Sequence, residues 1–218
     1  MRRRSRHALF TWLATLVAVT AMNLLTLGCD PEGEGETELV PDETALVAVW
    51  RPLVTAEGWR AIEDASRDPL SEHRPDEVIC TRLGWYPEDE TLEVDTSACN
   101  YLSIEHGLLE AVEPGDVLRL ELWWQTLISL EPAEGHLALW IDGEQVWEER
   151  VTIPGNADAR DVELTMDRSA PAGAPVVFHL HNHGTNTWRL RGLSVQRLEP
   201  AAGDPRETNE RDDEQRSE

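Results

Sequence analysis

Lysine is absent from this chain of 218 residues, cysteine occurs three times, and phenylalanine and tyrosine occur twice each. The 42 acidic residues outnumber the 19 basic ones, which gives a net charge of -23 at pH 7. This charge repels the phosphate backbone and excludes nucleic acid as a partner. The sequence also lacks a nucleophile elbow, a phosphate-binding loop, a dinucleotide fingerprint and an HExxH motif. We therefore favour a non-enzymatic protein without a cofactor.

The N-terminus has the composition of a secretion signal, with four arginines in residues 1–6 and an uncharged apolar run over residues 8–27. The run ends at Gly28-Cys29, which resembles the lipobox of bacterial lipoproteins, although Thr26 stands where that family prefers leucine. The resemblance implies a signal peptide over residues 1–28, lipidation of Cys29 and attachment to a membrane of the cell envelope, in an unspecified leaflet. Two alternatives stay open: cleavage before Met22, or an uncleaved run that spans the bilayer. All three place the remaining chain outside the cytoplasm.

The cysteine count agrees with lipidation, because acylation of Cys29 leaves one pair in an exported chain. Cys80 and Cys99 are then expected to form a disulfide that closes a loop of about 20 residues. The alternative is a two-thiolate metal site, which usually shows the closer CxxC spacing.

Two acidic segments flank the expected domain. Residues 29–44 combine carboxylates with turn-forming residues, and residues 199–218 contain no aromatic or large aliphatic side chain. Such segments cannot bury enough apolar surface to fold, so we expect a disordered tether and a disordered tail. Residues 45–198 remain as one domain of ordinary size.

Short strands with alternating polarity dominate this domain. In residues 117–125, every second side chain is apolar, and Asp142-Gly143 is a hairpin turn between two further strands. Strands are predicted over residues 44–50, 78–81, 92–94, 99–104, 117–125, 136–141, 145–151, 161–166, 176–183 and 188–197. One or two helical turns are predicted over residues 59–65. This pattern predicts an all-β, antiparallel β-sandwich of the jelly-roll type.

From about residue 99 to residue 198, the order of strands resembles the jelly-roll and galactose-binding-like modules with which bacteria hold carbohydrate. The resemblance rests on the turn at Gly115-Asp116, the hairpin at residues 140–143 and the closing strand. It implies a non-catalytic carbohydrate-binding domain. The segment 179–188 also resembles uncharacterised exported proteins of Gram-negative bacteria, which implies no activity.

Several polar and aromatic side chains are expected to point away from the core and to form one ligand-binding face. An aromatic ring offers a flat surface to the apolar face of a sugar, while fixed polar groups bind its hydroxyls. The candidate ligand-binding residues are Arg119, Glu121, Trp123, Trp140, His179, His181, Asn182, Asn186 and Trp188. The alternative is that Trp123 and Trp140 are covered by the N-terminal segment that contains Trp50 and Trp59.

His179, His181 and His183 follow i, i+2, i+4 spacing, which places three imidazoles about 7 Å apart on one side of a strand. The pair His179 and His181 resembles the His-x-His ligands of zinc enzymes and cupin-like sandwiches, but the glutamate that follows in cupins is replaced here by Gly184 and its neighbours. These three histidines are therefore weak metal candidates. Three functions stay open: a binding module for a polysaccharide or glycan, a structural or protein-interaction module of an envelope assembly, and a metal-dependent enzyme that uses His179 and His181.

Overall fold

The computed structural model describes residues 46–201. The expected signal peptide, the lipidation site Cys29 and the tether lie outside these residues, as does most of the expected C-terminal tail. No helix within residues 46–201 is long and apolar enough to cross a membrane.

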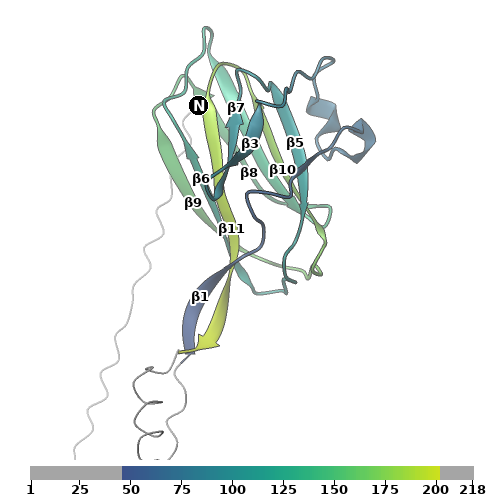
Figure 1. Ribbon diagram of the computed structural model, residues 1–218, viewed down its shortest axis with the longest axis vertical. Helices are drawn as coiled ribbons and strands as arrows, with labels where there is room; N and C mark the ends of the chain where they lie inside the picture. Colours follow the sequence, from purple (N-terminus) through teal and green to yellow (C-terminus); the bar gives the residue numbers. More distant parts are fainter. Residues whose placement is uncertain (1–45, 202–218) are drawn as a thin grey trace, which may run out of the picture. The chain divides into compact units, whose positions relative to one another are not determined.

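The described chain forms two antiparallel sheets, which face each other as layers (Figure 1). The first sheet contains β1 (Leu46–Pro52), β3 (Trp85–Glu88), β4 (Thr91–Asp95), β6 (Val117–Trp124), β9 (Asp158–Thr165) and β11 (Thr187–Pro200). The second sheet contains β2 (Arg60–Ala61), β5 (Tyr101–Gly107), β7 (Ala133–Ile141), β8 (Glu144–Ile153) and β10 (Pro175–Asn182). The predicted antiparallel β-sandwich is confirmed.

The strand order is that of a jelly roll. The first sheet follows the order β3-β4-β11-β6-β9, with β1 paired to β11, and the second follows the order β2-β5-β10-β7-β8. From β4 onward, the chain passes between the sheets at every connection except β7 to β8, which form a hairpin in one sheet. Asp142 and Gly143 both have positive φ in this turn, as a two-residue hairpin requires.

Alternation within the strands fills the space between the sheets. In β6, Leu118, Leu120, Leu122 and Trp124 are buried in the main core, as the sequence predicted. The side chains between them point to the outer face of the first sheet. Apolar burial on both inner faces is the main stabilising contribution, at about 25 cal/mol for each Å² removed from water.

The segment between β1 and β3 differs from the prediction. Residues 59–65 do not form a helix: the short strand β2 is followed by two 3-10 turns, η1 (Ala65–Arg67) and η2 (Ser71–His73). Trp59 packs in the main core, whereas Ile62 packs in a separate cluster on the outer face of the second sheet. A helix would place residues three apart on one side, so the chain must be extended here.

The region around the disulfide also differs in part. Residues 78–81 do not form a strand, because Cys80 makes only an isolated bridge with Cys99. Trp85–Glu88, which the sequence placed in a connection, forms β3. The predicted disulfide between Cys80 and Cys99 is confirmed.

Candidate functional site

The residues that were expected to share one ligand-binding face are divided among three locations. Arg119, Glu121 and Trp123 lie on the outer face of the first sheet, in β6. Trp140, His179 and His181 lie on the outer face of the second sheet, in β7 and β10. Asn182, Asn186 and Trp188 are buried. The predicted common face is therefore wrong. Alternation along a strand shows that a side chain points away from the core, but it does not show on which of the two sheets the side chain lies.

Trp188 belongs to the core between the sheets. Its side chain is 2% exposed, and its ring lies 5.1 Å from that of Trp124. A ring in this position has no open face for a ligand.

Asn182 and Asn186 organise a loop. The Asn182 side-chain amide donates to the Thr96 hydroxyl at 2.8 Å, and the Asn186 amide donates to Asn182 Oδ1 at 3.2 Å. The backbone N–H of Ile128 donates to Asn186 Oδ1 at 2.6 Å. Because these buried amides already have partners within the protein, they are not available to bind sugar hydroxyls.

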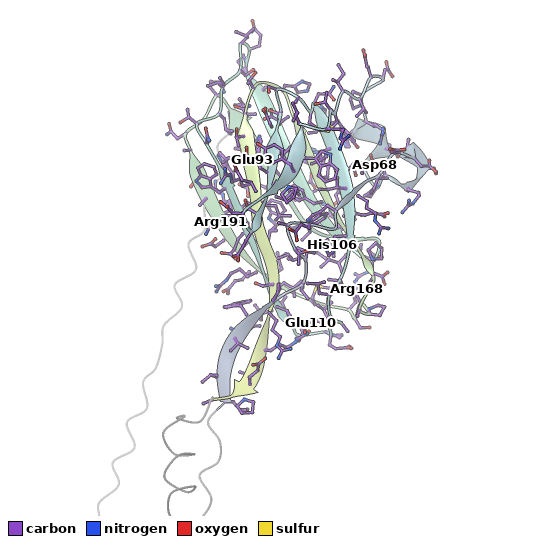
Figure 2. All side chains as sticks on the ribbon, viewed as in Figure 1. Asp68, Glu93, His106, Glu110, Arg168 and Arg191 are labelled. Carbon is purple, nitrogen blue, oxygen red and sulfur yellow. A yellow bond between two sulfur atoms is a disulfide. The ribbon has the colours of Figure 1, made fainter. Side chains whose placement is uncertain are left out.

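Residues 62–74, which we name the cover, lie over the outer face of the second sheet. Trp140 is 5% exposed and packs with Ile62, Leu70 and Val177. The alternative of a covered Trp140 is thus correct, although the covering residues differ from Trp50 and Trp59. Figure 2 shows Asp68 of the cover and Glu93 of the first sheet on different sides of the sandwich.

The histidines of β10 do not form a metal centre with their neighbours. His179 is fully buried, and within residues 46–201 no group of three or more His, Cys, Asp or Glu side chains is placed to hold a metal ion. The metal-dependent enzyme consequently lacks a ligand set in the described part of the chain.

The outer face of the first sheet carries a row of interacting side chains across four strands. Strand register places Tyr86, Glu93, Arg189 and Trp123 side by side. The Tyr86 hydroxyl donates to Glu93 Oε1 at 2.7 Å, and Arg189 Nε donates to Glu93 Oε2 at 2.7 Å. The Arg189 guanidinium in turn lies 5.5 Å from the ring centre of Trp123. The row therefore fixes a cation over an aromatic ring.

The charges within this row stabilise one another. Burial raises the pKa of the Glu93 carboxyl, but hydrogen bonds from Tyr86 and Arg189 outweigh burial, and the pKa lies below its ordinary value. The hydrogen bond to Glu93 raises the pKa of Tyr86 to about 12. At neutral pH, Glu93 is therefore ionised and Tyr86 is a donor.

A second tryptophan lies farther along the same face, in β1. The Arg119 guanidinium lies 3.9 Å from the ring centre of Trp50 and donates to Glu163 at 3.1 Å. Sequence reasoning did not include Trp50 among the site residues. The sequence predicts that Trp50 belongs to a strand over residues 44–50. It does not predict that this strand pairs with β11, nearly 150 residues away.

A groove of about 590 Å³ lies on this face beside residues 54–57 and the turn at residues 89–90. We name it the tryptophan groove, and its lining includes Trp50, Pro52, Glu121, Arg191, Gly192 and Ser194. Trp123 is not part of this lining but lies two residues after the lining residue Glu121 in β6. Arg191 is the extra residue of a bulge in β11, which directs its side chain toward the groove. Glu121 and Arg191 form no ion pair with another described residue, so their polar atoms are available to a ligand. Figure 2 shows Arg191 on the same side as Glu93.

No family model matches the sequence. No curated protein matches it either. Solved structures with a similar arrangement of strands include a carbohydrate-binding module studied for specific mannan recognition, with a TM-score of 0.41, 8% identity and coverage of 69% of this chain and 98% of that chain. A mutant carbohydrate-binding module of family 29 has a TM-score of 0.36, 10% identity and coverage of 69% of this chain and 92% of that chain. A family 51 module from Clostridium perfringens, in complex with methyl-galactose, has a TM-score of 0.33, 10% identity and coverage of 68% and 99%. At these scores, the likeness assigns neither a ligand nor a site to this chain.

Proposed function

We propose that this domain binds a polysaccharide non-catalytically in the tryptophan groove. The observation that carries the proposal is the partly exposed Trp50 in the lining of the groove, with the partly exposed Trp123 near it on the same outer face. The volume of about 590 Å³ lies within the range of about 300–1,000 Å³ that is usual for small-ligand sites. It is large enough for a few sugar units of a longer chain.

The chemistry of the groove suits sugar hydroxyls. Glu121 supplies acceptors, Arg191 supplies donors, and Trp50 supplies an apolar wall for the C–H face of a sugar ring. Arg119 and Arg189 hold the two tryptophan rings in place before a ligand arrives. Such preorganisation lowers the entropic cost of binding.

The proposal keeps Arg119, Glu121 and Trp123 from the expected site and adds Trp50 and Arg191. Trp140, His179, His181, Asn182, Asn186 and Trp188 have no part in it, because they lie on the other sheet or in the interior.

We also propose that the protein works outside the cytoplasm, attached to a membrane of the cell envelope through a lipid on Cys29. The Cys80–Cys99 disulfide supports the first part, because such bonds persist in oxidising compartments. The second part is supported by the signal-like N-terminus and the lipobox-like Gly28-Cys29. A covalent anchor also suits a chain whose net charge of -23 opposes electrostatic attraction to anionic lipids.

The test is a titration of the purified protein with a panel of cell-wall and extracellular polysaccharides. Tryptophan fluorescence and calorimetry detect the binding. We expect saturable binding that becomes about tenfold weaker or worse in Trp50→Ala, the loss typical of an aromatic anchor, and less strongly weakened in Trp123→Ala, because Trp123 lies beside the groove and not in its lining. Arg191→Ala should weaken binding, whereas Arg60→Ala should not. Arg60 is a matched control because it is also exposed and unpaired among the described residues but lies in the second sheet.

Binding that survives both tryptophan substitutions would place the site elsewhere and contradict the proposal. The absence of binding to every polysaccharide would instead favour the interaction module of an envelope assembly. Zinc, copper or iron at one equivalent in the same sample would favour the metal-dependent enzyme.

A further inference from the structure

Five of the six histidines in residues 46–201 gather at the outer face of the second sheet: four lie in β7, in β10 or directly after β10, and His73 lies in the cover. We name this group the histidine array; it consists of His73, His136, His179, His181 and His183. The ring centres of His73 and His136 are 5.7 Å apart, and those of His136 and His179 are 5.2 Å apart. The rings of His181 and His183 are 4.8 Å apart. Tyr101 connects the two parts, at 4.8 Å from His179 and 5.5 Å from His181.

The centre of the array is adapted to a neutral imidazole. His179 is 0% exposed, and neither of its ring nitrogens has a hydrogen-bond partner among the described residues. Burial, followed by the nearby His136 and His181, lowers the pKa of His179 to about 3. Burial, followed by the neighbouring His183, lowers the pKa of His181 to about 4. A proton on His179 would be buried beside other imidazoles, and one on His181 would be half-buried beside His183.

The cover lies over the centre of this array, where His136 and His179 are buried, whereas His181 is half-buried and His73 and His183 are exposed. Ile62 and Leu70 pack against Trp140, but η1 and η2 contain no buried residue. The polar attachments of the cover to β5 centre on Asp68, which accepts hydrogen bonds from the Ser103 hydroxyl at 3.1 Å and the Tyr101 hydroxyl at 2.8 Å. The Ile62 N–H also donates to the Ser103 carbonyl at 2.9 Å, and the exposed Arg67 pairs with Glu105 at 2.6 Å. A segment with so little buried apolar surface opens at a small fraction of the global unfolding free energy.

We propose that the cover is acid-sensitive: it opens from the second sheet when histidines of the array take up protons. Opening returns the buried His179 to water and exposes the half-buried His181 further, and imidazoles in water are readily protonated. It also moves His73, which belongs to the cover, away from His136. Protonation of the histidines therefore favours opening of the cover, and opening favours protonation.

The charged groups around the array determine which histidines act. Burial and the nearby Arg150 lower the pKa of His136, while the Glu148 carboxylate in β8, which accepts a hydrogen bond from His136 Nε2 at 2.8 Å, opposes them. From the cover, the Asp68 carboxylate faces Tyr101 and is paired with Arg74 at 3.1 Å. His179 and His181 form no ion pair with a described carboxylate. These two histidines therefore carry most of the acid response.

The lowered pKa values of these two histidines determine the direction in which pH changes the stability of the covered state. The covered state binds fewer protons than the open state, so its stability is complete above the ordinary histidine pKa of 6.5 and is lost as the pH falls toward 4. Each of the two histidines raises the ratio of open to covered molecules about 30-fold between pH 7.5 and pH 5.

Hydrogen exchange of the wild-type protein provides the first test. The backbone amides of Ser71, His73 and Arg74 donate hydrogen bonds within the cover. Their protection factors, corrected for intrinsic exchange at each pH, should fall at least about 30-fold between pH 7.5 and pH 5, while those of β6 and β11 stay constant. Constant protection in the cover, or a fall shared with β6 and β11, would overturn the proposal.

Two variants assign the effect to the array. His179→Met removes a titrating group at similar volume and should reduce the pH-dependent fall in protection. His106→Gln is the matched control, because His106 is buried in the same sheet but lies outside the array. Should His179→Met fail to fold, His181→Gln provides the same comparison. Identical pH profiles for the control and a folded array variant would contradict the proposal. None of these outcomes depends on polysaccharide binding, because the cover and the tryptophan groove lie on different sheets.

Discussion

At the scale of single residues, the two tyrosines lie on opposite faces of the sandwich, yet the phenol hydroxyl of each donates a hydrogen bond to a carboxylate. Tyr86 donates to Glu93 and Tyr101 to Asp68. The bond to Glu93 raises the pKa of Tyr86 to about 12, and burial together with Asp68 raises that of Tyr101 above its ordinary value. We therefore expect little tyrosinate absorbance from the native protein at about pH 11, where a free tyrosine is mostly ionised.

The stability that these phenols contribute is present below pH 10 and is lost as the pH rises toward 12, because the folded state retains the protons longer. Absorbance titration of the native and urea-unfolded protein measures both effects. Tyr86→Phe leaves Tyr101 as the only tyrosine and separates the two transitions. A native titration that coincides with the unfolded one would refute the assigned hydrogen bonds.

Trp188 provides a second prediction at this scale. A Cβ atom at Gly135 would lie 2.8 Å from Trp188 Cζ2, so Gly135→Ala must displace a buried ring. We expect a loss of about 1–3 kcal/mol in unfolding free energy, as for other overpacked cores, measured by urea denaturation. Gly107→Ala is the control, because its new Cβ would meet its nearest neighbour, Gly173, at an ordinary 3.5 Å. Equal losses in both variants would show that crowding against Trp188 is not the cause.

Alternation along a strand predicted which side chains leave the core, but it could not predict what lies over them. Trp123 and Trp140 have the same sequence signature, yet only Trp140 is covered, by Ile62 and Leu70 from a distant part of the chain. Likewise, Trp50 reaches the candidate site through a pairing that no local pattern encodes. The composition of the binding face therefore depends on contacts between residues far apart in the sequence.

At the scale of elements, the disulfide encloses the hairpin of β3 and β4, which supplies Tyr86 and Glu93 to the first sheet. We expect the double variant Cys80→Ser, Cys99→Ser to lose about 3 kcal/mol of unfolding free energy, the amount that a closed loop of about 20 residues contributes. Urea denaturation measures this loss. Cys29→Ser, which leaves the disulfide intact, should show none. If the double variant were as stable as the wild type, the disulfide would not constrain the unfolded chain.

Strands were predicted well where local patterning and tertiary contacts agree. In β6, each polar residue alternates with an apolar one, and both faces of the strand are used accordingly. The segment after Trp59 has a helix-compatible composition, but Trp59 and Ile62 pack in different clusters, so tertiary contacts prevail over local propensity.

At the scale of the whole molecule, the net charge of -23 produces repulsion among the excess carboxylates. The surface ion pairs are too weak to offset this repulsion. Each exposed pair, such as Arg168 with Glu144, contributes only about 0–1 kcal/mol. Salt weakens these pairs, but it also screens the repulsion among the excess carboxylates, which destabilises the compact state. Because acids outnumber bases by more than two to one, we expect the screening of repulsion to prevail.

Raising sodium chloride from about 0.05 M to about 0.5 M at pH 7 should therefore increase the unfolding free energy by about 1 kcal/mol. Sodium chloride is preferred to sulfate, which stabilises proteins through exclusion from their surface. Near the sequence pI of about 4.5, the net charge vanishes, and the same salt should have no effect or a slightly destabilising one. Urea denaturation at both pH values measures the difference. A salt response of equal size at the two pH values would show that repulsion between carboxylates does not limit the stability of this fold.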